Sequence, residues 1–202
     1  MGIVIGAEPD SSFANPLGLL SDCHRRIEKF LQNLIVLVSH DQAETLDLDH
    51  RHSLEVALRY FREAAPRHTR DEEESLFPKM RACGGETAAA AFVAIDALEA
   101  DHDKAGAAHD EIDRLGCKWL ADGQLTSGEA TDLHELLQSL QSLYAKHIEI
   151  EDTQIFPLAG QLLDATTIKA IGLEMAERRG IDLDKLPDLK LHCPTKRGTR
   201  IA

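Results

Sequence analysis

The sequence predicts an all-α protein, an up-down antiparallel four-helix bundle followed by a short extra helix. Three observations lead to this fold class. Residues are 43% apolar and 28% charged but only 4% aromatic, and the β-branched and aromatic runs typical of strands are scarce. Apolar residues recur at helical spacing, with glycine and proline concentrated between the helical segments. The third observation is an internal repeat.

The first two predicted helices follow a short leader. Residues 1–14 are expected to be loose, and Asn15 followed by Pro16 predicts a capped helix start. A second helix is expected over about residues 48–80, through a series of apolar positions at helical spacing. Pro66 lies inside this segment and should either kink the helix or mark a new start.

Glycine-containing turns separate the later helices. The second helix should stop at Cys83-Gly84-Gly85, as expected of a C-terminal glycine. Asp122-Gly123-Gln124 is a turn, after which Thr126 or Ser127 caps the fourth helix. The third, fourth and fifth helices are expected at about residues 87–121, 127–163 and 166–180. We therefore predict a bundle domain at residues 15–163, with a short helix and a tail over residues 164–202.

Charge and composition exclude several classes of function. The formal net charge of −13 argues against a nucleic-acid partner, because phosphate groups would be repelled. No uninterrupted apolar run approaches the ~18 residues of a membrane-spanning helix, and the start does not have the pattern of a secretory signal. The four cysteines lie far apart without a Cys-x-x-Cys pair. We expect reduced thiols and a cytoplasmic protein with no membrane partner.

The strongest signal is a repeat of two short motifs. Residues 68–78 read HTRDEEESLFP and residues 147–157 read HIEIEDTQIFP, with His, Glu, Phe and Pro at matching positions. Nearly the same shift brings His24 onto His102. Each half therefore carries one histidine on its first helix and one His-x-x-x-Glu motif on its second. The two Phe-Pro pairs are expected to be packing and helix-end features.

This spacing has a clear chemical use. Residues i and i+4 lie on one helix face, about 6 Å apart along the axis. A single His-x-x-x-Glu is usually an ordinary helix-stabilising pair, but the match between two halves favours ligands of metal ions. Four imidazoles and two carboxylates suit two iron ions, with the carboxylates bridging. The predicted metal ligands are His24, His68, Glu72, His102, His147 and Glu151.

The ordered set H…HxxxE…H…HxxxE resembles the hemerythrin-like, or His-His-Glu cation-binding, family over about residues 15–163. The resemblance implies an up-down four-helix bundle around two non-heme Fe ions with an oxo or hydroxo bridge. It also implies that the two histidines of the first half bind one iron and those of the second half bind the other. Glu72 and Glu151 would bridge the two ions.

The sequence departs from the oxygen-carrying members of that family at two places. Those proteins have a further histidine four residues after the third-helix ligand, where Gly106 stands in this chain. They also bridge with an aspartate five residues after a histidine, and Asp152 has this spacing from His147. We prefer Glu151 as the bridge because it matches Glu72 in the repeat. Reversible oxygen transport is not favoured.

Three other residues are candidates for a further ligand or for a partner of a ligand. Glu28 lies four residues after His24, and His109 lies seven residues after His102. Tyr144, three residues before His147, has a hydroxyl that could bind a small ligand or a metal. For each of the three, a purely structural role is the alternative.

These observations predict a di-iron protein that binds, senses or turns over a small oxidant: dioxygen, nitric oxide or hydrogen peroxide. Turnover would make it an enzyme that decomposes peroxide or reduces an oxidant. The alternative is a non-enzymatic iron or oxygen sensor, or an iron-handling protein, that acts through a protein partner. A structural bundle with zinc or with no metal is less favoured, because the ligands include no cysteine.

Overall fold

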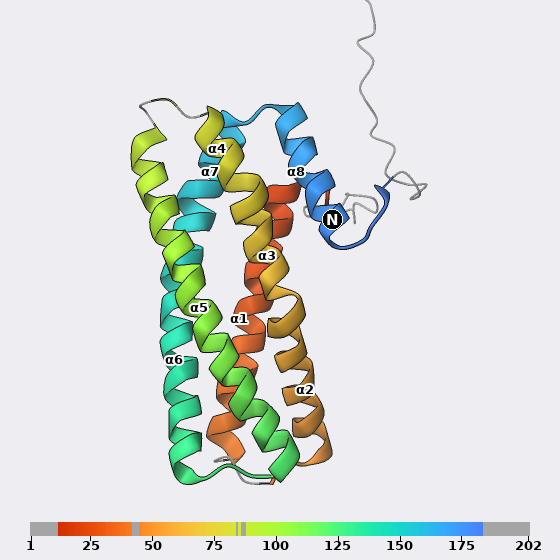
Figure 1. Cartoon of the computed structure of the whole chain (residues 1–202), viewed down its shortest axis with the longest axis vertical. Helices are drawn as coiled ribbons and strands as arrows, with labels where there is room; N and C mark the ends of the chain where they lie inside the picture. Colours follow the sequence, from red (N-terminus) through yellow and green to blue (C-terminus); the bar gives the residue numbers. More distant parts are fainter. Residues whose placement is uncertain (1–11, 42–44, 84, 86–87, 184–202) are drawn as a thin grey trace, which may run out of the picture.

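The computed structural model describes residues 12–41, 45–83, 85 and 88–183, and these form four antiparallel helical rods with a shorter helix beside one end (Figure 1). The rods consist of α1 (Pro16–Asp41); of α2 (Leu48–Glu63), α3 (Ala65–Asp71) and α4 (Phe77–Cys83); of α5 (Ala89–Asp122); and of α6 (Ser127–Ile150) and α7 (Phe156–Leu162). The short helix α8 spans Ala165–Arg178. The predicted fold class is confirmed. None of the described helices is both long enough and apolar enough to span a bilayer.

Each rod packs against two others. α1 lies beside α2 and α6, and α5 lies beside the same two helices, so that α1 and α5 occupy opposite corners. Four inward helix faces therefore meet along the bundle axis, where side chains from the two halves of the repeat can approach one another.

Local sequence explains where the helices begin and end. The backbone N–H of Gly18 donates to Asn15 Oδ1 at the start of α1, as the Asn-Pro pair predicts. At the start of α6, Thr126 and Glu129 form a reciprocal capping box. Gly123 ends α5 with a φ of 80°, a left-handed conformation that glycine adopts without strain. α2 ends just before Pro66, which lies in the first turn of α3, so the predicted break at this proline is confirmed.

The second and fourth rods each contain one π-helical turn, at Glu72–Leu76 and at Glu151–Ile155. The backbone N–H of Phe77 donates to the carbonyl of Glu72, five residues earlier, and the fourth rod repeats the pattern. A proline follows each of these turns; it has no N–H to donate, and its ring would clash with the carbonyl four residues earlier in an α-helix. The Phe-Pro pairs are therefore not helix ends, because both rods continue as α4 and α7.

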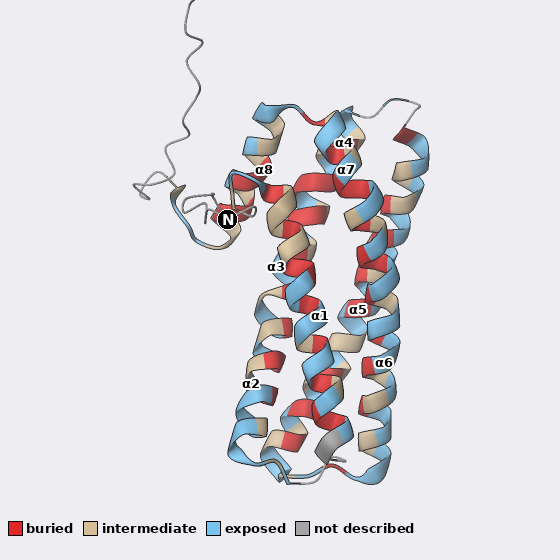
Figure 2. Ribbon diagram, turned by 180° about the vertical axis from the view of Figure 1, so that it is seen from behind, coloured by how far each residue is buried: buried red, intermediate tan, exposed pale blue. Residues whose placement is uncertain are grey.

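Two apolar clusters fill the bundle on either side of a polar layer, and Figure 2 shows the buried positions along the inward faces of the helices. The cluster toward the α2 end includes Leu34, Leu58, Leu115, Trp119 and Leu137. The cluster toward the α8 end includes Leu20, Phe77, Ile95, Ile155 and Met175. The buried polar residues between them are confined to one layer, since an isolated charge inside an apolar core is costly.

α8 is fixed to the second rod by a buried ion pair. Asp71 is 0% exposed, and Arg178 and Arg179 approach its carboxylate at 2.7 and 2.6 Å. Arg178 also donates to the hydroxyl of Ser75. Asp71 directly precedes Glu72, so α8 packs on the backbone that carries one of the predicted ligands.

Candidate metal centre

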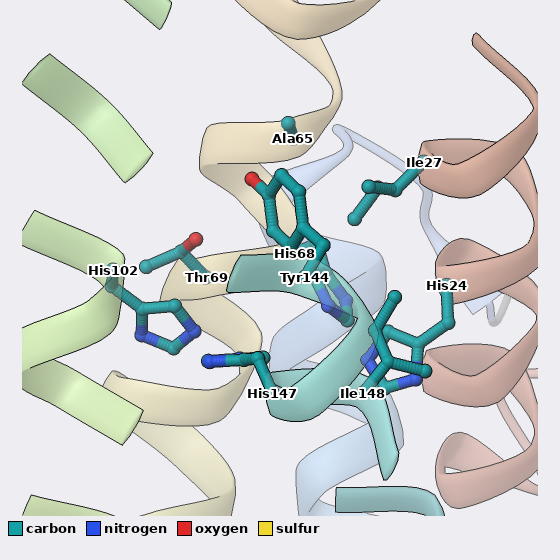
Figure 3. A pocket seen from close by; sticks show the side chains of 9 residues that line it. All are labelled: His24, Ile27, Ala65, His68, Thr69, His102, Tyr144, His147 and Ile148. Atoms are coloured by element: carbon teal, nitrogen blue, oxygen red, sulfur yellow. The ribbon is translucent and has the colours of Figure 1, made fainter. Parts of the chain in front are cut away.

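All six predicted ligands lie in the polar layer, and none is more than 8% exposed. α1, α3, α5 and α6 each contribute one histidine, and the two glutamates open the two π turns. Figure 3 shows the four imidazoles around one cavity inside the bundle, which Tyr144 also lines. The side chains that the repeat singles out are thus brought together from four helices.

Glu72 lies between histidines of both halves. Its Oε1 is 3.3 Å from His68 Nε2 and 3.8 Å from His24 Nε2. Its other oxygen, Oε2, is 3.4 Å from His102 Nε2. The two carboxylate oxygens therefore face different halves of the centre, which is the arrangement that a bridging carboxylate requires.

Glu151 has a similar position on the fourth rod. Its Oε2 is 3.1 Å from both His147 Nε2 and His24 Nε2. Donor atoms of His24, His68, Glu72 and Glu151 all lie within 4.8 Å of one another, and so do those of His102, His147 and Glu151. These donors form two adjacent groups that share Glu151, and each group could hold a metal ion.

Unpaired polar atoms indicate that the layer is built for cations. Both carboxylate oxygens of Glu72 and of Glu151 are buried and have no hydrogen-bond partner among the described residues, and the same is true of Nε2 of His24 and His102. Buried polar groups in proteins are nearly always paired, because an unpaired one costs free energy. Bound cations would satisfy these atoms, and a donor set of imidazole and carboxylate without sulfur fits iron.

The electrostatics of the layer support the same conclusion. Burial by itself lowers the pKa of His24, but contacts with Glu151 and Glu72 outweigh this effect and raise it to about 10. For His102 the opposing effects are burial and contact with Glu72, and the pKa rises to about 9. Burial would raise the pKa of Glu72, but His68 and His102 hold it well below its usual range. The carboxylates thus favour positive charge in the layer.

Each first-helix histidine is held by an acidic residue of the opposite half. Nδ1 of His24 donates to Asp152 at 3.0 Å, and Nδ1 of His102 donates to Glu73 at 2.8 Å. Such contacts fix the ring so that Nε2 faces the cavity. Both acids directly follow a predicted glutamate ligand, so their matched positions in the repeat were the sequence signal for this role.

The contact between Asp152 and His24 also decides between Glu151 and Asp152 as the candidate for the second bridging carboxylate. Asp152 lies behind His24, where Ser21 Oγ also donates to it at 2.9 Å, and Arg25 pairs with its carboxylate. Glu151 is 0% exposed and lies among the histidines. The structure therefore places Glu151 between Nε2 of His24 and Nε2 of His147, and Asp152 on the Nδ1 side of His24.

The structure does not bring Glu28 to the cavity. Its side chain is 44% exposed and pairs with Arg25 at 2.7 Å on the surface of α1. Helical spacing from His24 alone could not reveal this, because a residue four positions away can lie at the edge of the inward face.

His109 and Tyr144 form a pair beside the cavity. The Tyr144 hydroxyl is hydrogen-bonded to His109 Nε2 at 2.8 Å, and the imidazole stacks on Phe61 with ring centroids 4.5 Å apart. Burial lowers the pKa of His109 to about 4, with a smaller opposing effect from Asp110. His109 therefore touches the cavity only through Tyr144, which lines it.

Comparison with known proteins agrees with this geometry. A family model described as the hemerythrin HHE cation-binding domain matches residues 15–159. A protein of Haemophilus influenzae, described as uncharacterized, is 25% identical over 172 residues that cover 85% of this chain and 94% of the relative.

Proposed function

Because the chain belongs to the hemerythrin HHE cation-binding domain family, we propose that its buried layer binds two iron ions that react with a small oxidant. In this proposal the two histidines of the first half serve one ion and the two histidines of the second half serve the other. Glu72 and Glu151 serve both. The observation that carries the assignment is the orientation of Glu72, whose two oxygens face histidines of different halves.

The size of the cavity supports a small reactant. Its volume is about 10 Å³, close to the space of a single water molecule. Besides the histidines, it is lined by Ile27, Ala65, Thr69, Tyr144 and Ile148. An organic substrate would need the helices to move apart, whereas dioxygen, nitric oxide or hydrogen peroxide would need only small shifts of side chains.

The chain's own residues have separable roles in this proposal. Bound iron supplies open coordination positions and redox chemistry. Asp152 and Glu73 orient imidazoles, while the apolar side chains of Ile27 and Ile148 limit the access of water. The ring of Tyr144 borders the cavity, while its hydroxyl is hydrogen-bonded to His109. Gly106 stands where the oxygen carriers of the family have a fifth histidine ligand, so reversible oxygen transport is not proposed.

A second candidate is a non-enzymatic iron or oxygen sensor, or an iron-handling protein, that acts through a protein partner. The ion pair of α8 with Asp71 favours it, because Asp71 adjoins Glu72 and a change at the ligand would reach α8 directly. Three expectations from the sequence stay predictions: a cytoplasmic location, the absence of nucleic-acid and membrane partners, and the domain boundaries 15–163.

Metal analysis and a visible spectrum of aerobically purified protein test the main proposal. About two irons per chain with charge-transfer bands between an oxygen ligand and iron are expected. A zinc-loaded or colourless protein that does not respond to ferrous iron and air would contradict it. Mixing the reduced protein rapidly with peroxide, dioxygen or nitric oxide then separates turnover from stable binding, and so separates an enzyme from a sensor.

A matched pair of variants on α6 tests the ligand assignment. His147→Ala should lose at least one iron per chain, because it removes a buried imidazole from the layer. His134→Ala is the control, since His134 lies outside the layer and contacts Gln138. Two irons in the His147→Ala protein would show that the second motif is assigned wrongly.

A further inference from the structure

A second pocket, separate from the metal cavity, opens on the surface next to the end of α8. Its volume is about 230 Å³, and it shares no lining residue with the metal cavity. The start of α1, the junction of α2 with α3, and Arg179 at the end of α8 form its walls.

Positive charge gathers at this pocket. Arg26, Arg67 and Arg179 all line it, in a chain whose formal net charge is −13. Arg179 is neutralised by Asp71 at 2.6 Å. Arg26 and Arg67 are exposed, and no ion pair or hydrogen bond of their guanidinium groups is found in the part of the chain that the structure describes. Two cations are therefore available to an anionic group.

The remainder of the lining is largely apolar and ordered by contacts. Phe13 and Tyr60 supply aromatic rings, and Leu19 supplies an aliphatic side chain. The Tyr60 hydroxyl donates to the carbonyl of Cys23 at 3.4 Å, and the Arg179 guanidinium lies 5.9 Å from the centre of the Phe13 ring. The pocket thus combines unpaired cations with a preformed apolar wall, as small-molecule sites do.

We propose that this pocket binds a small organic anion, with its carboxylate or phosphate group at Arg26 and Arg67 and its apolar body against Phe13 and Tyr60. A volume of about 230 Å³ is below the roughly 300–1,000 Å³ of sites for drug-sized ligands, so the ligand is a compact molecule. The pocket is close to the metal centre along the chain, since Cys23 precedes His24 and the partner of Arg179, Asp71, precedes Glu72.

Calorimetric titration of the full chain as purified tests this site with three probes of similar shape. Benzoate and phenyl phosphate should bind, and the tighter of the two identifies the head group. Benzamide, which has no charge, should bind at least tenfold more weakly. Added salt should weaken the binding of both anions, because the cations are exposed. Equal affinity for benzamide, or no binding of either anion, would overturn the proposal.

Arginine variants locate the bound anion. Arg26→Ala and Arg67→Ala should each lower the affinity about tenfold or more, since each removes a charge-assisted contact. Arg59→Ala is the matched control, because Arg59 is an exposed arginine of α2 outside the pocket. A carboxylate that bound instead to a metal ion would keep its affinity in the Arg26 and Arg67 variants. That result would refute the anion pocket without bearing on the iron proposal.

Discussion

In the first half of the repeat, Ala65 lines the metal cavity three residues before His68, whereas in the second half Tyr144 lines it three residues before His147. The residues that follow these histidines also differ: Thr69 in the first half corresponds to Ile148 in the second. A hydroxyl-bearing ring therefore borders the cavity on one side, and a methyl group borders it on the other.

The contacts outside the cavity differ as well. Asp71, which precedes Glu72, is paired with two arginines of α8, but the corresponding position before Glu151 is Ile150. His109, the partner of Tyr144, corresponds to Leu31. The proposed ligands are symmetric because two similar ions need similar donors, whereas the side chains around them are not under that constraint. The two proposed ion positions are thus expected to differ in metal affinity and reactivity.

Removal of a shared carboxylate should have the largest effect. Glu72→Gln replaces the group that faces histidines of both halves, so we expect metal content to fall from the proposed two ions per chain to at most one. Metal analysis after gel filtration measures this. Glu63→Gln, on the same rod but exposed, is the control. If the Glu72 variant still bound two ions per chain, Glu72 would not be a metal ligand, and the two glutamates of the repeat would have different roles.

The second-largest effect is expected from removing the ion pair between Asp71 and α8, which the second half does not have. Asp71→Ala leaves two arginines facing a buried position without their carboxylate, and losses of about 3–5 kcal/mol are typical when one partner of a buried pair is removed. Urea denaturation at fixed metal content measures the free energy of unfolding. Ile150→Ala, at the matching position, should cost about 1 kcal/mol because that side chain is only half-buried. If both variants lost the same free energy of unfolding, the ion pair with α8 would not stabilise the first half more than packing stabilises the second.

The titration of His109 should make the second half sensitive to acid. The unfolded imidazole binds a proton near pH 6.5, whereas the folded one does so only at about pH 4. Stability from the neutral form is therefore complete above pH 6.5 and is lost as the pH falls toward 4, by on the order of 3 kcal/mol.

The variant His109→Gln should flatten this part of the stability profile, because an amide can hydrogen-bond Tyr144 without titrating. The comparison uses metal-free protein, in which the raised pKa values of His24 and His102 do not interfere, since their contribution is constant below pH 6.5. Denaturation curves of both proteins from pH 7 to 4 provide the comparison. Parallel profiles would exclude His109 as the source of acid sensitivity.

The smallest effect is expected where Glu28 of the first half corresponds to Gly106 of the second. A Cβ at Gly106 would meet no atom within 4 Å. Gly106→Ala should therefore stabilise α5 by about 0.5–1 kcal/mol through helix propensity. The same change at Gly172 should destabilise, because its Cβ would lie 1.8 Å from the carbonyl oxygen of Phe13. Thermal denaturation can resolve both signs.

The sequence by itself determined the fold class, the approximate helices and the six residues of the polar layer. These features depend on short-range regularities: apolar residues at helical spacing, caps such as Asn15 and Thr126, and the four-residue step from histidine to glutamate. The repeat also predicted one long-range feature: the ligands of the two matching halves should lie close together in the bundle. This prediction did not depend on how the helices are rotated about their axes relative to one another.

Only the tertiary structure decided which side chains of different rods touch. The contact of Asp152 with His24 joins residues 128 positions apart, and it left Glu151, not Asp152, facing Nε2 of the histidines. The rotation of α1 left Glu28 at the surface. The unpaired arginines of the second pocket likewise come from separate rods. Such contacts depend on the packing of whole helix faces, and spacing along the sequence does not specify that packing.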